Sequence, residues 1–212
     1  MTRSRPISTM AKKTTAPKFE RIPPDERRAR LIEASIACLA KGGIQAFTVD
    51  NICRESGTSR GLITHHFGSK NALLAEVYAT IYGKVLENLD RISEAPESLD
   101  DLIEMVIGDS ALDRDHLNEW LALWGEIVVN PALQAEHRKN YALYRDRVAR
   151  AISAFARAKG FTIDSHDAAT ILISLVDGLW LEQCIDQSVL SQARAKDLCR
   201  RTLSAVLGPI PG

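Results

Sequence analysis

The sequence predicts an all-α protein. Apolar residues recur at intervals of three and four from about Asp25 almost to the end of the 212-residue chain, and no stretch shows the polar/apolar alternation of a half-buried strand. Glycine or proline stands at several breaks in this pattern, such as Gly42-Gly43, Pro96 and Pro131. With 45% hydrophobic and 25% charged residues, the chain has the composition of a soluble globular protein of one or two domains.

Residues 1–24 are predicted to form a flexible basic arm. They hold half of the prolines and six basic residues against a single acidic one. Two interpretations stay open: a solvated tail, or an arm whose Lys12, Lys13, Lys18 and Arg21 reach DNA phosphates or the minor groove.

The first helix is expected from near Asp25 to Lys41. Gly42-Gly43 can end it, because glycine adopts the left-handed backbone found at helix ends. Its inward-facing residues are expected to be Leu31, Ile32, Ile36 and Leu39. This helix should brace the two short helices that follow.

Two short helices joined by a glycine turn are predicted between Thr48 and Lys70. Thr48 can cap the first by accepting a backbone N–H, and apolar residues follow at helical spacing. Gly57 can end that helix, and Ser59 offers a new N-cap two residues later. This is the layout of a helix-turn-helix.

The second short helix has the surface of a helix that reads DNA. Leu62 and Ile63 are expected to point into the core. The outward residues are then small, polar or basic: Ser59, Arg60, Gly61, Thr64 and His65. Such a helix can enter a major groove. The alternative is purely structural, because short helix pairs with a glycine turn also occur in all-α proteins that bind no nucleic acid.

Charge distribution favours the DNA interpretation. Residues 1–70 carry 13 basic and 6 acidic residues, a net charge of +7, whereas the rest carries 14 basic and 21 acidic residues, a net charge of −7. Affinity for DNA draws heavily on neutralising phosphates, so the basic part is the part expected to bind it.

Further helices are predicted after the helix-turn-helix. A long helix should start near Ser69 and stop before Pro96, and Ser98 with Asp101 forms a capping signal for the next one. The later helices are expected over residues 98–112, 113–130, 131–159, from 164 through at least 181, and 191–207.

The helix that contains Ile171 to Leu181 is apolar on nearly all sides and is expected to be buried all round. With the last helix it has more apolar surface than a surface helix needs, which suggests self-association. The alternative is that both helices only complete a core within one chain.

The segment from Gly57 to Leu74 resembles the recognition region of the TetR family of bacterial transcriptional regulators. The quoted stretch comprises Gly57, Thr58, Ser59, Arg60, Gly61, Leu62, Ile63, Thr64, His65, His66, Phe67, Gly68, Ser69, Lys70, Leu73 and Leu74. It departs from the usual pattern at Thr58, Thr64 and His66. A hydroxyl residue at Thr64 followed by H-H-F-x-x-K-N-x-L-L is most similar to the BetI-type (betaine-pathway) repressors.

The resemblance implies a complete architecture and function. TetR-type proteins have nine or so helices, with an N-terminal three-helix DNA-binding domain and a helical domain for ligand binding and dimerisation. Here these domains would span residues 25–70 and 71–212, with the dimer interface at roughly 165–207. The expected function is a ligand-responsive repressor that binds a palindromic operator as a homodimer and is released by a small-molecule effector.

Within this hypothesis each DNA-contacting residue has an expected role. Thr48 and Lys70 would contact phosphate, and His66 the backbone or a base edge. The outward set of the second short helix would face the groove. Arg60 is the strongest base-reading candidate, because a guanidinium can grip guanine with two hydrogen bonds.

An effector site is predicted where aromatic residues gather in the second part of the chain. Its candidates are Trp120, Trp124, Tyr141, Tyr144, Asp177 and Trp180. Aromatic faces with a carboxylate attract quaternary ammonium groups, and the BetI-like resemblance makes choline or a related cation the expected effector. The alternatives are ordinary core packing of the rings and an Asp177 that pairs with an arginine or caps a dimer contact.

Two other functional classes explain the sequence less well. An enzyme could use Glu126, His137, Asp177 and Glu182, but the sequence has no glycine-rich phosphate loop, no H-E-x-x-H pair and no nucleophile elbow. A helical adaptor that binds protein would not explain the basic N-terminal part. We therefore expect no catalysis, no metal and no cofactor.

The cysteines and the hydropathy pattern indicate a cytoplasmic protein. The four cysteines are far apart without C-x-x-C spacing, which predicts buried, reduced thiols. No run approaches the roughly 20 consecutive apolar residues that cross a bilayer, so no membrane partner is expected.

Overall fold

A computed structural model describes residues 23–92, 96–108 and 114–208. Within these ranges the chain forms nine α-helices and no strand, which confirms the all-α prediction. In chain order they are α1 (Pro24–Ala46), α2 (Val49–Ser56), α3 (Arg60–Phe67), α4 (Lys70–Ile92), α5 (Leu99–Val106), α6 (Arg114–Ile127), α7 (Pro131–Lys159), α8 (Ser165–Ile185) and α9 (Gln192–Leu207). The arm cations Lys12, Lys13, Lys18 and Arg21 lie outside the described residues.

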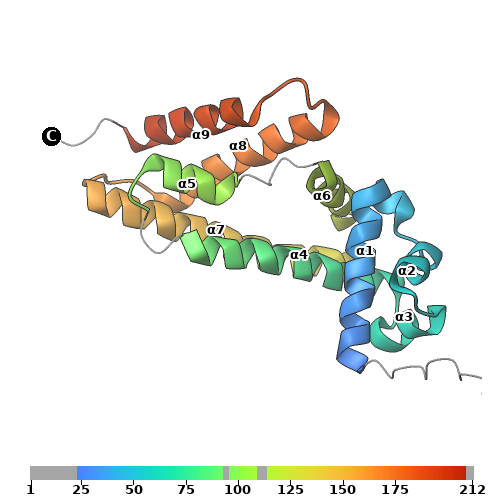
Figure 1. The fold of residues 1–212 in the computed structure, drawn as a ribbon. Helices are drawn as coiled ribbons and strands as arrows, with labels where there is room; N and C mark the ends of the chain where they lie inside the picture. Colours follow the sequence, from blue (N-terminus) through green and yellow to red (C-terminus); the bar gives the residue numbers. More distant parts are fainter. Residues whose placement is uncertain (1–22, 93–95, 109–113, 209–212) are drawn as a thin grey trace, which may run out of the picture.

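Helices α1, α2 and α3 gather at one end of the molecule and form its head (Figure 1). Helix α4 leaves the head and runs beside α7, while α8 and α9 pair farther from it. Helix α6 packs against α1, where the Asn118 side-chain amide donates to the carbonyl oxygen of Ala40 at 3.1 Å. Two helices outside the head, α4 and α6, therefore hold it in place.

The two short helices of the head begin and end where the sequence predicts, whereas α1 continues to Ala46, past the end predicted at Lys41. The Thr48 hydroxyl accepts a hydrogen bond from the Asn51 backbone N–H at 3.2 Å, and Gly57 has the left-handed angles φ 67° and ψ 25°. Ser59 occupies the N-cap position of α3 with an extended backbone, but its hydroxyl makes no capping hydrogen bond. Helix α1 kinks at Gly42 and Gly43, one turn before its end.

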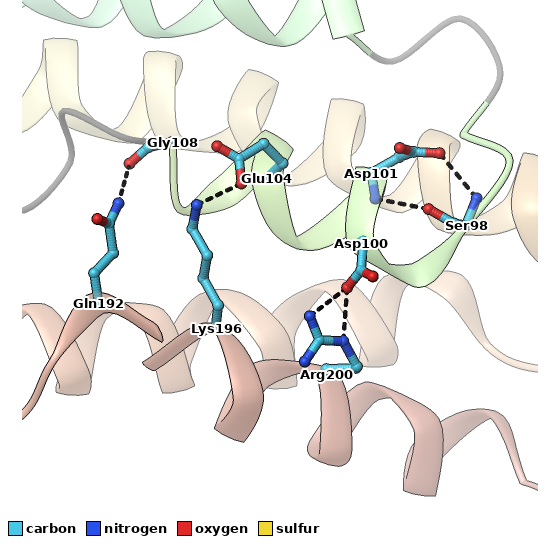
Figure 2. A network of polar contacts seen from close by, with 8 residues as sticks. All are labelled: Ser98, Asp100, Asp101, Glu104, Gly108, Gln192, Lys196 and Arg200. Carbon is cyan, nitrogen blue, oxygen red and sulfur yellow. Dashed lines mark hydrogen bonds and ion pairs between the residues drawn. The ribbon is translucent and has the colours of Figure 1, made fainter. Parts of the chain in front are cut away.

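Helix α5 is shorter than predicted. It opens with the expected capping box, in which Ser98 and Asp101 bond each other's backbone N–H, but it ends at Val106 rather than near residue 112. Ile107 leaves the helical conformation, and the carbonyl of Gly108 accepts from α9 instead. A polar ladder thus joins α5 to the antiparallel α9, through Asp100–Arg200, Glu104–Lys196 and Gly108–Gln192 (Figure 2).

The boundary between α6 and α7 also differs from the prediction. Helix α6 ends at Ile127, because Asn130, expected to be its last residue, caps the next helix. The Asn130 side-chain oxygen accepts from the N–H groups of Ala132 and Leu133 at 3.1 and 3.3 Å. An asparagine that satisfies two N-terminal donors stabilises a helix start more than a helix interior.

The buried residues form two hydrophobic clusters, and α4 contributes to both. Its first half, from Leu73 to Tyr82, packs with the head, with α6 and with Trp180 of α8. Its last turns, with Leu86 and Leu89, pack with α5, α7, α8 and α9. The core of the head therefore includes side chains from the other helices, and the head has no separate core.

Helix α8 is not buried all round, which corrects the prediction for a single chain. One face is buried, but Ile171, Leu181 and Ile185 are 44%, 39% and 78% exposed. In the described residues α8 is also the helix long and apolar enough to cross a bilayer by length and composition, a test that core helices of soluble proteins pass too.

All four cysteines are free thiols. Cys38 and Cys199 are buried as expected, whereas Cys53 and Cys184 are only half-buried. Burial raises the pKa of Cys184 and of Cys199 to about 11, so both thiols are protonated and unreactive at neutral pH.

Replacing Gly57 with alanine should destabilise the head. A Cβ meets no neighbouring atom there, but the positive φ of 67° strains any residue that carries one, at a cost of about 1–2 kcal/mol. The midpoint of urea unfolding should fall accordingly. The matched control is Gly61→Ala in α3, where the Cβ also meets nothing and φ is not positive; this change should stabilise the chain by about 0.5–1 kcal/mol. Equal effects from both changes would contradict the backbone argument.

Candidate nucleic-acid interface and ligand site

Helix α3 presents a polar face to solvent. Ile63 is buried at 2% exposure and Leu62 is half-buried, so both point toward the head core as predicted. The residues predicted to face the groove are all exposed: Ser59, Arg60, Gly61, Thr64 and His65. The arrangement leaves one side of α3 free to approach a partner.

Contacts among α1, α2 and α3 hold the head together. The Lys41 ammonium of α1 pairs with Glu55 of α2 at 2.8 Å, and Arg28 of α1 stacks over the ring of Phe67 at 5.2 Å. At the turn, the hydroxyls of Ser56 and Thr58 share a hydrogen bond of 2.8 Å. Thr58, a departure from the TetR pattern, is therefore part of the turn rather than of the exposed face.

Arg60 has a partner that the sequence reading missed. Its guanidinium lies 2.5 Å from a carboxylate oxygen of Asp50 in the first turn of α2, with both side chains more than half exposed. An exposed ion pair contributes little free energy, so Arg60 can exchange Asp50 for a base edge at small cost. The only sequence signal for this pair was opposite charge on two consecutive short helices.

The other three candidates sit at the margins of this face. Thr48 is exposed, although its hydroxyl already caps α2. Lys70 is exposed at the start of α4, with its ammonium 5.7 Å from the Phe47 ring centroid. His66 is half-buried, and its ring packs edge-on against that of His65 at 5.0 Å.

Aromatic side chains from four helices meet between the head and the far end of the molecule. The cluster comprises Tyr78 and Tyr82 of α4, Trp120 and Trp124 of α6, His137, Tyr141 and Tyr144 of α7, and Trp180 of α8. Within it Trp120 packs on the α4 tyrosines, with its ring centroid 4.9 Å from that of Tyr82. Trp124 pairs with Trp180 instead, at 5.2 Å.

Tyr78 and Tyr82 were absent from the predicted ligand site. They lie one helical turn apart on the buried side of α4, at 0% and 6% exposure. Their spacing could have indicated a shared face, but sequence alone does not say that this face meets α6 and α7.

Asp177 is the charged group of this cluster. Its carboxylate accepts a hydrogen bond from the Tyr141 hydroxyl at 2.7 Å. Burial raises the pKa of Asp177, and the Tyr141 hydrogen bond only partly offsets this effect. Within the described ranges no Lys or Arg pairs with it, so it has no arginine partner in the single chain, and the dimer contact considered above stays an alternative. A half-buried anion among aromatic faces is suited to a cation.

A second polar contact crosses the cluster between α4 and α7. The Tyr78 hydroxyl lies 2.7 Å from Nδ1 of His137, whose ring in turn packs on that of Tyr141 at 5.0 Å. Burial lowers the pKa of His137, with a smaller contribution from the positive charge of Arg145. His137 is therefore a neutral imidazole at pH 7.

Two family models match the chain. Residues 31–77 match the model described as bacterial regulatory proteins, tetR family, and residues 95–208 match that of the BetI-type transcriptional repressor C-terminal domain. Together they cover most of the head, the first turns of α4 and all five helices from α5 to α9. The chain belongs to the TetR family. The resemblance noted from residues 57–74 is confirmed, and with it the helix-turn-helix interpretation of α2 and α3.

Individual relatives agree with the family assignment. The regulator BetI 2 of Chromohalobacter salexigens is 30% identical over 190 residues, covering 85% of this chain and 88% of its own, and BetI of Escherichia coli K12 is 27% identical over 184 residues, covering 84% and 92%. A transcriptional regulator structure from Pseudomonas aeruginosa PAO1 has a TM-score of 0.74 at 34% identity, covering 86% of this chain and 91% of its own.

One further structural relative carries a ligand. It is a transcriptional regulator from Saccharomonospora viridis solved in complex with choline, with a TM-score of 0.73, 24% identity and coverage of 84% of this chain and 95% of its own. At this identity the likeness concerns the fold.

The family establishes what the chain does in general terms. It is a DNA-binding transcriptional regulator of the ligand-responsive kind, and its relatives are regulators rather than enzymes. Among the described residues no three His, Cys, Asp or Glu side chains are grouped to hold a metal ion.

Replacing Arg60 with alanine should relax sequence preference. A bidentate arginine–guanine contact is worth about 1–3 kcal/mol of discrimination, so the ratio of operator to scrambled-site affinity should fall roughly tenfold to a hundredfold. Competition binding with fluorescent duplexes measures this ratio.

The matched control is Asp50→Ala, which breaks the same ion pair while keeping the guanidinium. This variant should retain most of the operator preference and bind unrelated DNA somewhat better, because a negative charge near phosphates is gone. An unchanged preference in Arg60→Ala would remove Arg60 from the base-reading role.

Proposed function

We propose that the protein is a homodimeric repressor that binds a palindromic operator through two copies of α3 and leaves it when a small cation enters the regulatory domain. The observation that carries the proposal is the exposed polar face of α3 in a chain of the TetR family with a BetI-type C-terminal domain. Two heads on one dimer must meet half-sites on the same face of the DNA. Such a regulator works in the cytoplasm and needs no membrane partner.

Retention of DNA tests the central function. Genomic fragments bound by the purified protein should share an inverted repeat, and a gel shift with the region upstream of its own gene should show a discrete complex. A helical adaptor for proteins, the competing hypothesis, would retain fragments without a common repeat.

The exposed face of α8 supports the dimer. Its exposed positions recur at helical spacing and combine apolar with small side chains: Ile171, Ser174, Gly178, Leu181 and Ile185. Small residues let two helices approach closely, and an apolar stripe on a long helix is costly in water. Pairing this face with a second copy through α8 and α9 would bury it, as expected for the last two helices.

Replacing Ile171 with glutamate should dissociate the dimer. The side chain is 44% exposed in one chain, so the monomer should still fold, but an unpaired charge buried in the interface should weaken association roughly hundredfold. Light scattering across a concentration series measures this. The control is Val128→Glu, at a residue 79% exposed after α6, which should leave a dimer. A wild-type chain that is monomeric at micromolar concentration would contradict the dimer proposal.

A quaternary ammonium compound is the proposed effector. Tyr82, Tyr141 and Tyr144 offer aromatic faces, and Asp177 offers a carboxylate without a cationic partner in the described part of the chain. Cation–π attraction and one negative charge are the two interactions that recognise a cation which has no N–H to donate. Choline in a relative of the same fold, and the BetI type of the C-terminal domain, support this choice.

Replacing Asp177 with asparagine should weaken choline binding about tenfold to a hundredfold, because the amide keeps the shape and the Tyr141 contact but loses the charge. Isothermal titration measures the affinity. The control is Asp167→Asn on the exposed side of the same helix, which should bind choline as the wild type does.

The charge of Asp177 should make choline affinity depend on pH. Burial raises the pKa of Asp177, so choline affinity should fall as the pH drops toward that pKa and the carboxylate is neutralised. No heat with choline, betaine or betaine aldehyde at neutral pH would exclude this class of effector.

A further inference from the structure

The Tyr78–His137 hydrogen bond connects the helix that carries the DNA-reading head with the helix that lines the ligand cluster. Tyr78 lies eight residues after the start of α4, and α4 itself begins three residues after the end of α3. Its hydroxyl is 2.7 Å from Nδ1 of His137 on α7. Tyr78 is fully buried, so its hydroxyl cannot exchange this bond for one to bulk water without moving, whereas His137 is half-buried.

From His137 the connection continues to the proposed effector carboxylate. The rings of His137 and Tyr141, one turn apart on α7, pack at 5.0 Å with an interplanar angle of 32°. The Tyr141 hydroxyl then donates to Asp177 on α8 at 2.7 Å. We call Tyr78, His137, Tyr141 and Asp177 the relay; its four side chains span α4, α7 and α8.

Both tyrosine hydroxyls of the relay keep their protons, because burial raises the pKa of Tyr78 and of Tyr141, and burial lowers the pKa of His137. The Tyr141 hydroxyl therefore donates to the Asp177 carboxylate. In the Tyr78–His137 pair either atom can donate, according to which ring nitrogen of His137 carries the proton. With the proton on Nε2 the Tyr78 hydroxyl donates to Nδ1, and the variants below test that arrangement.

The Tyr78–His137 bond is placed where it can constrain the position of α4 close to the head. In the described ranges two polar contacts join α4 to α7, and the other is the ion pair of Asp90 and Arg147 at 3.2 Å near the far end of α4. Between them the two helices pack through apolar and aromatic side chains, including the rings of Tyr82 and Tyr144 at 6.5 Å. Such packing is non-directional, whereas a hydrogen bond requires a particular distance and angle, so Tyr78 and His137 make the polar contact that constrains the register of α4 on α7 close to the head.

We infer that the Tyr78–His137 hydrogen bond is the positioning contact through which occupation of the Asp177 site changes the placement of α4 and so of the DNA-reading head. The inference rests on the proposed function, because it needs a cation at Asp177 and an operator bound by α3. It assigns to Tyr78 and His137 a role in coupling, and leaves ligand contact to Tyr141 and Asp177.

The coupling has a physical source in the carboxylate. A bound cation gives Asp177 a second partner that competes with the Tyr141 hydroxyl for the same oxygen atoms. Any shift of the Tyr141 ring displaces the His137 ring packed on it, and the Tyr78 hydroxyl must then move with α4 or lose its acceptor. The Tyr78–His137 bond then differs in strength between the placement of α4 with a ligand bound and its placement without one. This difference contributes to the coupling free energy between the ligand site and the head.

The test is the operator affinity of the full-length protein with and without saturating choline, in the wild type and in Tyr78→Phe. The ratio of the two dissociation constants is the coupling factor. Phenylalanine keeps the ring packing and removes the hydroxyl, which also contacts the Tyr82 hydroxyl on the same helix, so the coupling factor should fall about threefold to tenfold, the range for one hydrogen bond. Operator affinity without choline and choline affinity without operator should stay within about twofold of wild type, which a general loss of structure would not allow.

A matched pair at His137 makes the test independent of how well Tyr78→Phe folds. Asparagine places an acceptor near the position of Nδ1, so His137→Asn should keep most of the coupling factor, whereas His137→Leu has no acceptor and should lose it as Tyr78→Phe does. Thermal unfolding of each variant, compared with the wild type, confirms that the chains are folded.

Each outcome decides the inference. A coupling factor at the wild-type value in Tyr78→Phe and His137→Leu overturns it while leaving the proposed effector intact. A similar loss in His137→Asn and His137→Leu overturns it too, since the acceptor would then be irrelevant. If choline does not change operator affinity even in the wild type, the proposed effector fails and the inference falls with it. If Tyr78→Phe loses choline affinity instead of coupling, Tyr78 is a ligand-contacting residue and the positioning role is wrong.

Discussion

The shared burial of helix α4 is the constraint on which the rest of the structure depends. Its first half completes the core of the head, and its last turns complete the core made by α5, α7, α8 and α9. A helix is stiff along its axis, so one that is packed into two cores cannot move in one of them without disturbing the other. Any ligand that shifts α4 in the regulatory core therefore also shifts the helices that face DNA.

The aromatic cluster lies against the part of α4 that packs with the head. Tyr78 and Tyr82 belong to α4, and the rings around them come from α6 and α7, the helices that also touch the head or lead away from it. Burial raises the pKa of Asp177 beside these rings, so its charged form carries a desolvation cost. In the proposed function a bound cation would offset this cost, and the free energy of its binding would be available to change packing nearby.

Much of the fold could be predicted because its signals are local. Thr48, Gly57, Asp164 and Ser191 act as caps or helix ends where the sequence places them, since a capping hydrogen bond spans only two or three residues. The reading face of α3 was also predictable, because helical spacing alone separates Ile63 from Arg60 and Thr64. The length of α5 was not, because the segment after Val106 contacts α9, where the Gln192 side-chain amide donates to the Gly108 carbonyl from 84 residues away.

By itself the sequence determined most of the helices, the resemblance to the family and the polar, exposed face of α3, all of which follow from periodicity, capping and a dense local motif. Tertiary structure alone decided that Asp50 pairs with Arg60 and that the ring of Trp124 packs against that of Trp180. It also decided that α8 has an exposed apolar face and that the Tyr78 hydroxyl contacts His137. These contacts join residues from different helices, and their geometry depends on how the helices cross. A pattern of residue types along one helix carries no information about that crossing.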